Sequence, residues 1–161
     1  MSQCQWIMES SIGPLYLVAN DHGLEGIFWK KRPVKVVDSL KGKDKAHLIL
    51  RQAISEIEEY LEGRREVFDV PLDPQGTEFQ KRVWKELSKI PYGKTYSYKD
   101  IAKKLNQENA SRAVGTANGK NPLSLIVPCH RVINANGKLG GYAGGLSIKQ
   151  KLLALESRIK S

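Results

Sequence analysis

The first third of the chain alternates between apolar and polar positions in three short runs. Apolar side chains recur through residues 6–8, 13–19 and 26–29, and residues 20–23 between the last two runs are typical of a turn. Alternation with a period of two is the pattern of a half-buried strand. We therefore expect an antiparallel sheet of about three strands.

The apolar period lengthens to between three and four residues near Ala46, which predicts a helix. Gly63 ends that helix, because glycine adopts the left-handed conformation of a helix C-terminus at little cost. The apolar stripe consists of Leu50, Ala53, Ile54, Ile57 and Leu61. Alternating Phe68, Val70 and Leu72 then predict one more short strand.

A segment rich in proline and glycine, residues 71–76, marks the expected boundary between two domains. The predicted domains are residues 1–73, a scaffold of sheet and helix in which we find no catalytic constellation, and residues 74–161. The sequence therefore predicts a mixed α/β (α+β) protein whose chemistry lies in its second half.

Two helices with good N-caps are expected early in this second half. Thr77 can cap a helix over residues 78–88, and Gln80 three positions later completes a capping box. Ser97 can cap a second helix over residues 98–105.

A third helix follows after only four polar residues, 106–109, an arrangement typical of a helix-turn-helix DNA-binding motif. Its inward positions are Ala110, Ala113, Val114 and Ala117. Its outer face is expected to carry Ser111, Arg112, Gly115, Thr116, Asn118 and Gly119. Glycine in a helix costs roughly 1 kcal/mol against alanine, and close approach of a DNA backbone is a reason to accept that cost. Arg112 is the one large side chain of this face. It is either an ordinary exposed arginine or a probe inserted into a partner, and its isolation among small residues favours the probe.

Charge is divided unevenly between the halves of the chain. Residues 1–75 carry 10 Lys+Arg against 12 Asp+Glu, a net −2, whereas residues 76–161 carry 16 against 5, a net +11. Such asymmetry favours a polyanionic partner for the basic half. We therefore weigh nucleic acid ahead of a merely solvated basic surface.

The run of β-branched and apolar residues over 125–133 has the composition of a buried strand, but Pro128-Cys129-His130-Arg131 interrupts it. Proline cannot donate to a sheet ladder, so the strand should end or kink at Pro128. The kink places a thiol and an imidazole on irregular backbone. Cys129 is therefore either a small core residue or a nucleophile whose proton His130 takes.

Glu156 is the one acidic residue after Glu108, which makes it the only local candidate for a carboxylate that orients His130. It lies in a last helix, residues 147–159, on the flank of the apolar stripe, where a surface position is the simpler interpretation. That stripe consists of Ile148, Leu152, Leu155 and Ile159. The sequence thus allows Cys-His-Glu chemistry beside a DNA-binding helix, where a base must be flipped out of the duplex to be reached.

Composition predicts few additional components. The two cysteines, Cys4 and Cys129, and three scattered histidines have no metal-ligand spacing near Cys129, so we expect no metal there. No apolar run approaches the ~20 residues of a membrane span, and the N-terminus lacks the apolar core of a signal peptide. We therefore expect a cytoplasmic protein with both cysteines reduced.

Residues 76–156 closely resemble the O6-alkylguanine-DNA alkyltransferases (methylated-DNA–protein-cysteine methyltransferases). The matching motifs are Gly76-Thr77-Glu78-Phe79-Gln80, Ile90-Pro91-Tyr92-Gly93, Ser97-Tyr98, Arg112-Ala113-Val114-Gly115, residues 117–122, residues 126–132 and residues 141–146. The first half resembles the family's ribonuclease-H-like sheet-and-helix domain only in outline. The resemblance implies a second domain that is helical, winged-helix-like and carries the active site.

The resemblance implies direct reversal of DNA damage. An O6-alkylguanine, or an O4-alkylthymine, is flipped out of the duplex, and its alkyl group moves irreversibly to a cysteine without metal or cofactor. By position, Cys129 is implied as the acceptor, His130 as the base acting through water, and Glu156 as the residue that orients the histidine.

The remaining implied roles concern the substrate. Asn121 would order the segment approaching the active site, and Tyr98 would donate to the guanine ring as it leaves. Arg112 would take the place of the extruded base. Main chain at Cys129, Val132 and Ala143 would hold the base edge, and Tyr142 would line the pocket. Ser111, Gly115 and Thr116 would face the DNA.

Two departures from the family pattern bear on function. Some members hold a structural zinc in the first domain, but here Cys4 stands alone, with Asn20 and Glu25 near the expected ligand positions, so we predict no zinc. A related group of binding-only proteins has tryptophan in place of the reactive cysteine. Cys129 therefore argues for chemistry rather than lesion flagging.

The alternative function is a DNA-binding sensor of alkylation or oxidation. No separate transcription-factor domain is present in 161 residues, which favours a repair protein. A cysteine hydrolase leaves the basic helix-turn-helix unexplained. We expect a monomer that acts on double-stranded DNA.

Overall fold

The computed structural model describes residues 3–160, with side chains described through residue 157. The chain forms two compact units, Met1–Gln75 and Gly76–Ser161. None of the helices within the described range is long and apolar enough to cross a membrane.

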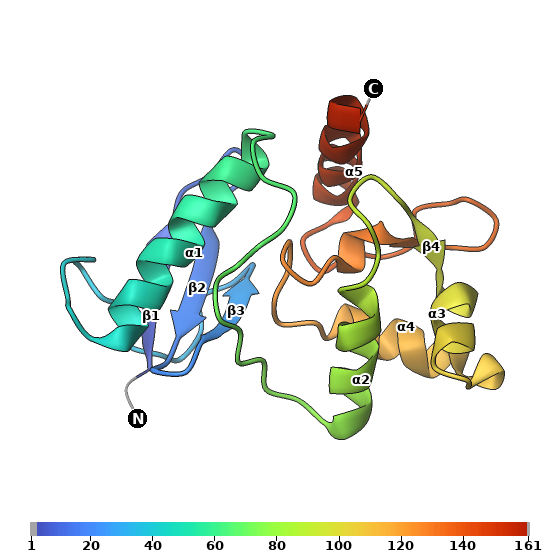
Figure 1. Cartoon of the computed structure of the whole chain (residues 1–161), viewed down its shortest axis with the longest axis horizontal. Coiled ribbons are helices and arrows are strands. Elements are labelled where there is room, and N and C mark those ends of the chain that lie inside the picture. Colours follow the sequence, from blue (N-terminus) through green and yellow to red (C-terminus); the bar gives the residue numbers. More distant parts are fainter. Residues whose placement is uncertain (1–2, 161) are drawn as a thin grey trace. The chain divides into compact units, whose positions relative to one another are not determined.

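Unit 1 contains the expected three-stranded antiparallel sheet, in the order β1-β2-β3. Its strands are β1 (Cys4–Met8), β2 (Leu15–Ala19) and β3 (Leu24–Phe28). The turn between β2 and β3 closes where the backbone N–H of Asn20 donates to the carbonyl of Gly23 at 3.0 Å. Helix α1 (Lys45–Leu61) lies along one face of this sheet (Figure 1).

The apolar stripe of α1 forms the core against the sheet. Leu50, Ala53 and Ile57 are fully buried. The helix begins at Asp44, whose carboxylate accepts from the backbone N–H of His47, and ends just before Gly63, which has a φ of +79°. The predicted helix and its glycine stop are therefore confirmed.

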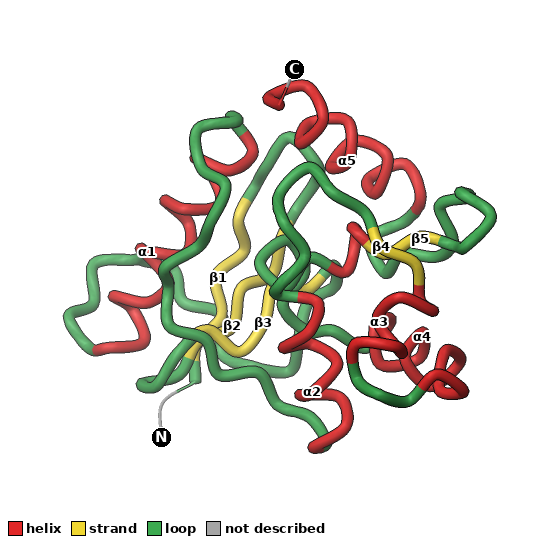
Figure 2. Tube along the Cα trace, turned by 45° about the vertical axis from the view of Figure 1, so that its right-hand side comes forward, coloured by secondary structure: helices red, strands yellow, loops and turns green. Residues whose placement is uncertain are grey.

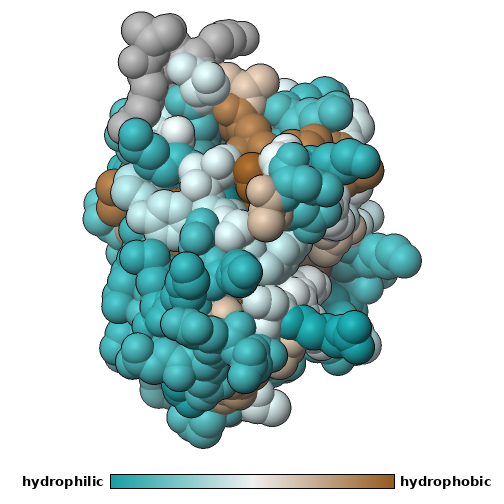
Figure 3. Space-filling model, turned by 90° about the vertical axis from the view of Figure 1, so that its right-hand side faces the viewer, coloured by the Kyte–Doolittle hydropathy of each residue, from teal (hydrophilic) through white to brown (hydrophobic). Residues whose placement is uncertain are grey.

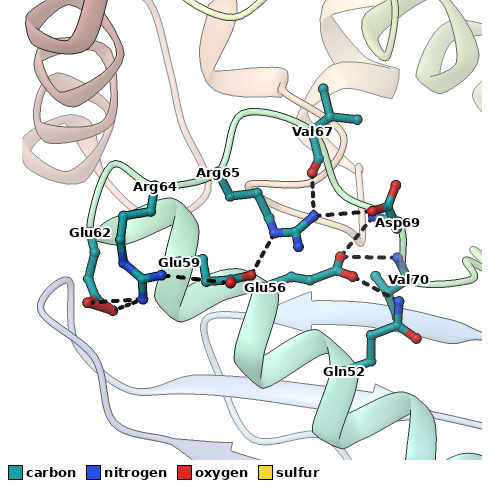
Figure 4. A network of polar contacts seen from close by, with 9 residues as sticks. All are labelled: Gln52, Glu56, Glu59, Glu62, Arg64, Arg65, Val67, Asp69 and Val70. Carbon is teal, nitrogen blue, oxygen red and sulfur yellow. Dashed lines mark hydrogen bonds and ion pairs between the residues drawn. The ribbon is translucent and has the colours of Figure 1, made fainter.

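The strand predicted from Phe68, Val70 and Leu72 is wrong. Only Leu72 forms an isolated bridge, with Leu24, and its side chain is 40% exposed. A side chain replaces the ladder, because the buried carboxylate of Glu56 accepts from the backbone N–H groups of Asp69 at 2.9 Å and Val70 at 3.1 Å (Figure 4). The backbone donors are satisfied without a neighbouring strand.

Arg65 belongs to the same network and holds the turn that precedes Asp69. Its Nε donates to Glu59 at 2.8 Å and its Nη1 donates to the carbonyl of Val67 at 2.8 Å (Figure 4). The first contact joins the turn to α1 and the second closes the turn on itself, so this network is structural.

Unit 2 is mainly helical, with one two-stranded parallel sheet. Its helices are α2 (Glu78–Leu87), α3 (Tyr98–Lys104), α4 (Ser111–Gly119) and α5 (Leu146–Lys160). Its 3-10 turns are η1 (Glu108–Ala110) and η2 (Cys129–Arg131), and its strands are β4 (Tyr96–Ser97) and β5 (Val132–Ile133). These elements, with those of unit 1, confirm the expected mixed α/β fold.

Helices α3 and α4 pack side by side and form the expected helix-turn-helix (Figure 2). Thr77 and Ser97 cap α2 and α3, as predicted. Thr77 forms the expected capping box with Gln80, and Ser97 forms a further one with Asp100, which was not predicted. The indole N–H of Trp84, on α2, donates to the carbonyl of Ala117 at 2.9 Å and anchors α4.

The buried face of α4 differs from the predicted one. Ala113 is exposed, whereas Asn118, expected on the outer face, is only 6% exposed. The inward positions are Val114, Ala117 and Asn118, at i, i+3 and i+4. A lone alanine costs little in water, so the apolar pattern by itself did not fix which face turned inward.

The predicted strand over residues 125–133 survives only as Val132–Ile133. Leu125 adopts a φ of +76°, and the backbone N–H of Val127 donates to the carbonyl of Leu123 at 2.9 Å, so this stretch is a buried turn. A turn around Gly137 follows β5, with Asn134 N–H donating to Lys138 O at 2.9 Å, and no strand returns from it.

The last helix follows a different inward stripe from the predicted one. Lys149, Leu152 and Glu156 are buried, whereas Ile148 and Leu155 are half-buried. The side chain of Ile159 lies outside the described residues.

Candidate active site

The backbone turns sharply at Pro128, as predicted. Pro128 has φ −79° and ψ 63°, and the N–H of Cys129 donates to the carbonyl of Val127 at 2.7 Å, which makes an inverse γ-turn. The 3-10 turn η2 follows, closed by a bond from Arg131 N to Pro128 O at 2.9 Å. Cys129 and His130 therefore leave the strand geometry in which adjacent side chains point to opposite faces.

The carboxylate of Glu156 is the centre of a buried polar cluster. It is 1% exposed, and its Oε2 lies 2.7 Å from Nε2 of His130, which is fully buried. Arg131 donates to both carboxylate oxygens, from Nε at 2.8 Å and from Nη2 at 2.9 Å. The surface position suggested by helix phase is wrong, because these donors replace the water that Glu156 loses on burial.

Arg131 is itself held by two further contacts. Its Nη1 donates to the carbonyl of Ile90 at 2.8 Å, and its guanidinium lies 5.5 Å from the centroid of the Tyr92 ring. The segment around residues 90–92 thereby connects to η2 and α5.

These contacts set the protonation states of the cluster. Burial alone raises the pKa of Glu156, but hydrogen bonds from His130 and Arg131 lower it to about 2. Burial lowers the pKa of His130, against the raising effect of its bond to Glu156. At neutral pH the pair is therefore an ionised carboxylate and a neutral imidazole. Since the carboxylate accepts, Nε2 carries the ring proton and Nδ1 is the basic nitrogen.

The Cys129 thiol is 4% exposed. Burial raises its pKa above the ordinary value of 9.0, partly offset by a hydrogen bond with Asn121 and by the positive charge of Lys149. The resting sulfur is consequently a protonated thiol that needs a base before it can attack.

Asn121 shapes the turn that leads to Cys129. Its Nδ2 donates to the carbonyl of Val127 at 2.8 Å, and its Oδ1 accepts from the backbone N–H of Leu123 at 3.0 Å. This side chain closes residues 121–127 into a loop and reaches the sulfur as well.

A cavity of about 300 Å³ opens above Cys129. Its lining residues are Tyr98, Gly115, Asn118, Gly119, Asn121, Cys129, Gly141, Tyr142 and Ala143. Helix α4 thus forms one part of the cavity wall, and the glycine-rich loop before α5 forms another. The volume is at the small end of the range for ligand sites.

Tyr98 fits between two glycines. A Cβ on Gly115 would lie 3.7 Å from Cδ1 of Tyr98, and one on Gly140 would lie 3.4 Å from its hydroxyl. Burial, and then the sulfur of Cys129, raise the pKa of Tyr98 above 10.0, so the hydroxyl keeps its proton.

The structure brings six of the predicted site residues to this cavity and leaves the others elsewhere. Tyr98, Gly115, Asn121, Cys129, Tyr142 and Ala143 line it. His130, Glu156 and Val132 are buried and are not among the lining residues. Arg112 and Thr116 are exposed on α4, and Ser111 is half-exposed. Much of the surface on the side of unit 2 shown in Figure 3 is hydrophilic, with smaller apolar areas.

Sequence reasoning missed two charged residues of the site, Arg131 and Lys149. Arg131 belongs to the interrupted strand, and its only sequence signal was its place next to His130. Lys149 is fully buried and stands seven residues before Glu156, which puts both on one helix face. That spacing was the available signal. No signal in the sequence indicated that Asn118 would line the cavity.

Asn20 and Glu25, which lie near the positions where some family members hold zinc ligands, belong to a hydrogen-bonded cluster. Nδ2 of Asn20 donates to Glu25 at 2.7 Å and to Asp73 at 2.8 Å. Within the described part of the chain, no group of three or more His, Cys, Asp or Glu side chains is arranged to hold a metal ion.

Both halves of the chain match known protein families. Residues 78–158 match the family model of the 6-O-methylguanine DNA methyltransferase DNA binding domain, and residues 6–74 match that of the ribonuclease-like domain of the same proteins. The chain belongs to the 6-O-methylguanine DNA methyltransferase family. This confirms the resemblance seen in the sequence motifs.

Individual members of the methyltransferase family are similar to this protein over nearly the whole chain. The methylated-DNA–protein-cysteine methyltransferase of Methanosarcina acetivorans is 51% identical over 152 residues, which cover 93% of this chain and 96% of that one. The crystal structure of Mycobacterium tuberculosis OGT in complex with DNA superposes with a TM-score of 0.84 at 41% identity, covering 97% and 94% of the two chains. A methyltransferase from Pyrococcus kodakaraensis, at 23% identity and a TM-score of 0.55, shares the fold.

Proposed function

We propose that this protein is a methylated-DNA–[protein]-cysteine S-methyltransferase. It takes the alkyl group of O6-alkylguanine, and of O4-alkylthymine, from double-stranded DNA onto the Cys129 sulfur in one irreversible step. The observation that carries the proposal is a thiol at the floor of a cavity of about 300 Å³, followed in the chain by a histidine paired with a buried carboxylate at 2.7 Å. Since the acceptor is consumed, the protein repairs one lesion per molecule.

The proton transfers follow from the protonation states. Nδ1 of His130 accepts the thiol proton through a bridging water, and Glu156 stabilises the imidazolium that forms. The thiolate attacks the alkyl carbon, the bond from that carbon to O6 breaks, and its electron pair passes to the guanine. Tyr98 donates a proton to the ring, and the imidazolium returns one to Tyr98. The products are a thioether and neutral guanine, so neither metal nor cofactor is needed.

The base would lie between the two walls of the cavity. Main chain at Cys129, Val132 and Ala143 is proposed to hold its edge, with Tyr142 beside it. Val132 contributes through its carbonyl, which already accepts from Lys149 at 2.7 Å and has a second lone pair. Asn121 keeps the loop before Cys129 in place.

DNA binding is assigned to α4. Its exposed Arg112 is proposed to fill the gap left by the extruded base, while Ser111, Gly115 and Thr116 face the backbone. In this proposal residues 74–161 bind DNA and accept the alkyl group, and residues 1–73 are a scaffold. The protein is proposed to act as a monomer, in the cytoplasm, on DNA.

The alternative of a redox sensor is disfavoured by the environment of the thiol. Sensor cysteines are accessible and have lowered pKa values. Cys129 is buried, and burial raises its pKa.

The deciding experiment is an intact mass measurement after incubation with duplex DNA that carries O6-methylguanine. We expect one added methyl group, located at Cys129 by peptide mapping, and an end point equal to the amount of protein. Unmodified duplex is the control for adventitious alkylation. No adduct, or repair that continues beyond one lesion per molecule, would refute the proposal.

A further inference from the structure

Lys149 is a buried lysine that the mechanism above does not use. It lies on the first turn of α5 and is 0% exposed. Within the described residues, no carboxylate lies within ion-pair distance of its ammonium. A buried ammonium without a counter-ion is costly to maintain, so its contacts need an explanation.

Among the described residues, the hydrogen bonds of the ammonium all go to main-chain carbonyls. Nζ donates to Val132 O at 2.7 Å, to Gly141 O at 3.1 Å and to the carbonyl of Leu139. An ammonium has three N–H donors, so the set is complete. The first carbonyl belongs to β5, which follows η2 and Cys129, and the other two belong to the loop that forms a wall of the cavity.

Residues 139–141 lie in an irregular part of the loop, whereas Tyr142 has contacts of its own. Its ring meets the His130 ring edge-on, with the centroids 6.5 Å apart, and its hydroxyl hydrogen-bonds with Ser124. Gly140 adopts a φ of +71°, and residues 138–143 belong to no helix or strand. Beyond Gly141 come Tyr142 and Ala143, which line the cavity. Lys149 therefore joins the irregular 139–141 segment to β5 through a single side chain.

The charge of Lys149 also acts on the sulfur. Burial lowers the pKa of Lys149 from its ordinary value of 10.5, and the nearby Cys129 sulfur raises it. The same interaction favours the thiolate form of Cys129. A neutral side chain of equal length would supply neither this charge nor the three donors.

We propose that Lys149 is a positioning residue of the alkyl-transfer site, whose ammonium fastens the 139–141 loop to β5 and so sets the cavity wall against Cys129. This inference rests on the proposed function for its kinetic consequence, but not for its structural one. Helix α5 then contributes two residues to the site: Lys149, which holds the cavity wall, and Glu156, which binds His130.

The test compares Lys149→Ala with Lys151→Ala, which removes an exposed lysine from the same helix. Hydrogen exchange is followed at the amides of residues 139–143, and single-turnover methyl transfer is followed against DNA concentration. We expect Lys149→Ala to speed exchange in this loop by about tenfold or more, because a tie between loop and strand is lost. The rate at saturating DNA should fall by about 100-fold with lesion-free duplex affinity unchanged, the pattern of a group that acts only in the transition state.

Chemical rescue separates the ammonium from simple packing. Propylammonium has the atoms that the alanine variant lacks, and 1-propanol matches it in size without the charge. We expect rate recovery with propylammonium and none with 1-propanol, whereas a merely structural void would respond to both.

Loop exchange and transfer rates equal to those of Lys151→Ala would overturn the inference, as would equal rescue by both additives. If the unsubstituted protein transfers no methyl group, the proposed function fails, and the exchange data still decide the role of Lys149. If Lys149→Ala does not fold, Lys149→Gln, one methylene shorter and uncharged, takes its place. Unchanged loop exchange in that variant would likewise overturn the inference.

Discussion

Arg131 binds Glu156 through two parallel N–H···O bonds, from Nε to Oε1 at 2.8 Å and from Nη2 to Oε2 at 2.9 Å. This two-point geometry is the strongest pairing available between these groups. It keeps the carboxylate ionised on the side where it meets the imidazole of His130. Two consecutive residues of η2, His130 and Arg131, therefore share one acceptor on α5.

Replacing Arg131 with methionine should destabilise the fold strongly. The carboxylate of Glu156 would remain buried without its cation, a situation that costs about 3–5 kcal/mol. Urea unfolding of Arg131→Met measures the loss. Arg112→Met, at an exposed arginine, is the matched control and should change the unfolding free energy by no more than about 0.5 kcal/mol. Equal losses in the two variants would contradict a structural role for the pair.

Replacing Glu156 with glutamine should slow methyl transfer by about 100-fold or more, the usual range for a lost acid–base partner. The amide cannot stabilise an imidazolium, and its NH2 group can donate to Nε2 and reverse the tautomer of His130. Single-turnover kinetics on duplex with O6-methylguanine give the rate. Glu108→Gln, at an exposed carboxylate, should react at the unsubstituted rate. A full rate in Glu156→Gln would remove this residue from the mechanism.

The buried thiol should make stability fall at alkaline pH. Burial raises the pKa of Cys129 in the folded protein above 9.0, so the unfolded thiol ionises first as the pH rises. The contribution of the thiol to the free energy of unfolding is therefore complete below pH 9.0 and is lost above it. The loss approaches about 1.4 kcal/mol per pH unit until the folded thiol also ionises. Comparing unfolding free energies of the unsubstituted protein and Cys129→Ser isolates the effect, since Tyr98 and Tyr142 titrate in both. A pH-independent difference would show that burial does not perturb the thiol.

Alanine at Gly115 should affect stability and DNA binding in opposite directions. The added Cβ would meet Tyr98 at an ordinary 3.7 Å, and helix propensity then favours alanine by about 0.5–1 kcal/mol. If DNA approaches α4 closely, the same methyl group weakens duplex binding. Thermal unfolding and a duplex titration measure the two effects. Increased stability with unchanged DNA affinity would place the duplex away from this face.

Removing the Arg112 side chain should impair transfer more than binding. In Arg112→Ala the gap in the base stack stays open, so we expect a loss of about tenfold or more in transfer from duplex, given the few kcal/mol that unstacking costs. Non-specific affinity for DNA should fall only slightly, because one phosphate contact is lost. The slope of log affinity against log salt concentration should then be smaller by about 1. Single-stranded DNA with the same lesion is the control and should react equally with both proteins. Unchanged transfer from duplex would refute the proposed insertion.

Local signals in the sequence were sufficient for most elements. The capping residues Thr77 and Ser97, the stop at Gly63 and the alternation of the first strands each act on their immediate neighbours, so they could be recognised without tertiary information. The kink at Pro128 belongs with them, since proline limits its own backbone.

The errors arose where a distant group decides the outcome. Val70 and its neighbours form no strand because Glu56, fourteen residues earlier, supplies the acceptor. Glu156 is buried because Arg131 and His130 pair with it, which helix phase does not reveal. Lys149 escaped notice because three carbonyls, rather than an acidic side chain, are its partners.

The enclosure of Cys129 also bears on how the unreacted molecule survives. Thiols are lost to peroxide and to diffusing alkylators in proportion to their thiolate content and accessibility. With 4% of the residue exposed and burial raising its pKa, the sulfur meets few such reagents in a reactive form. For the proposed single transfer, this burial keeps the unreacted thiol available for an electrophile that is delivered into the cavity.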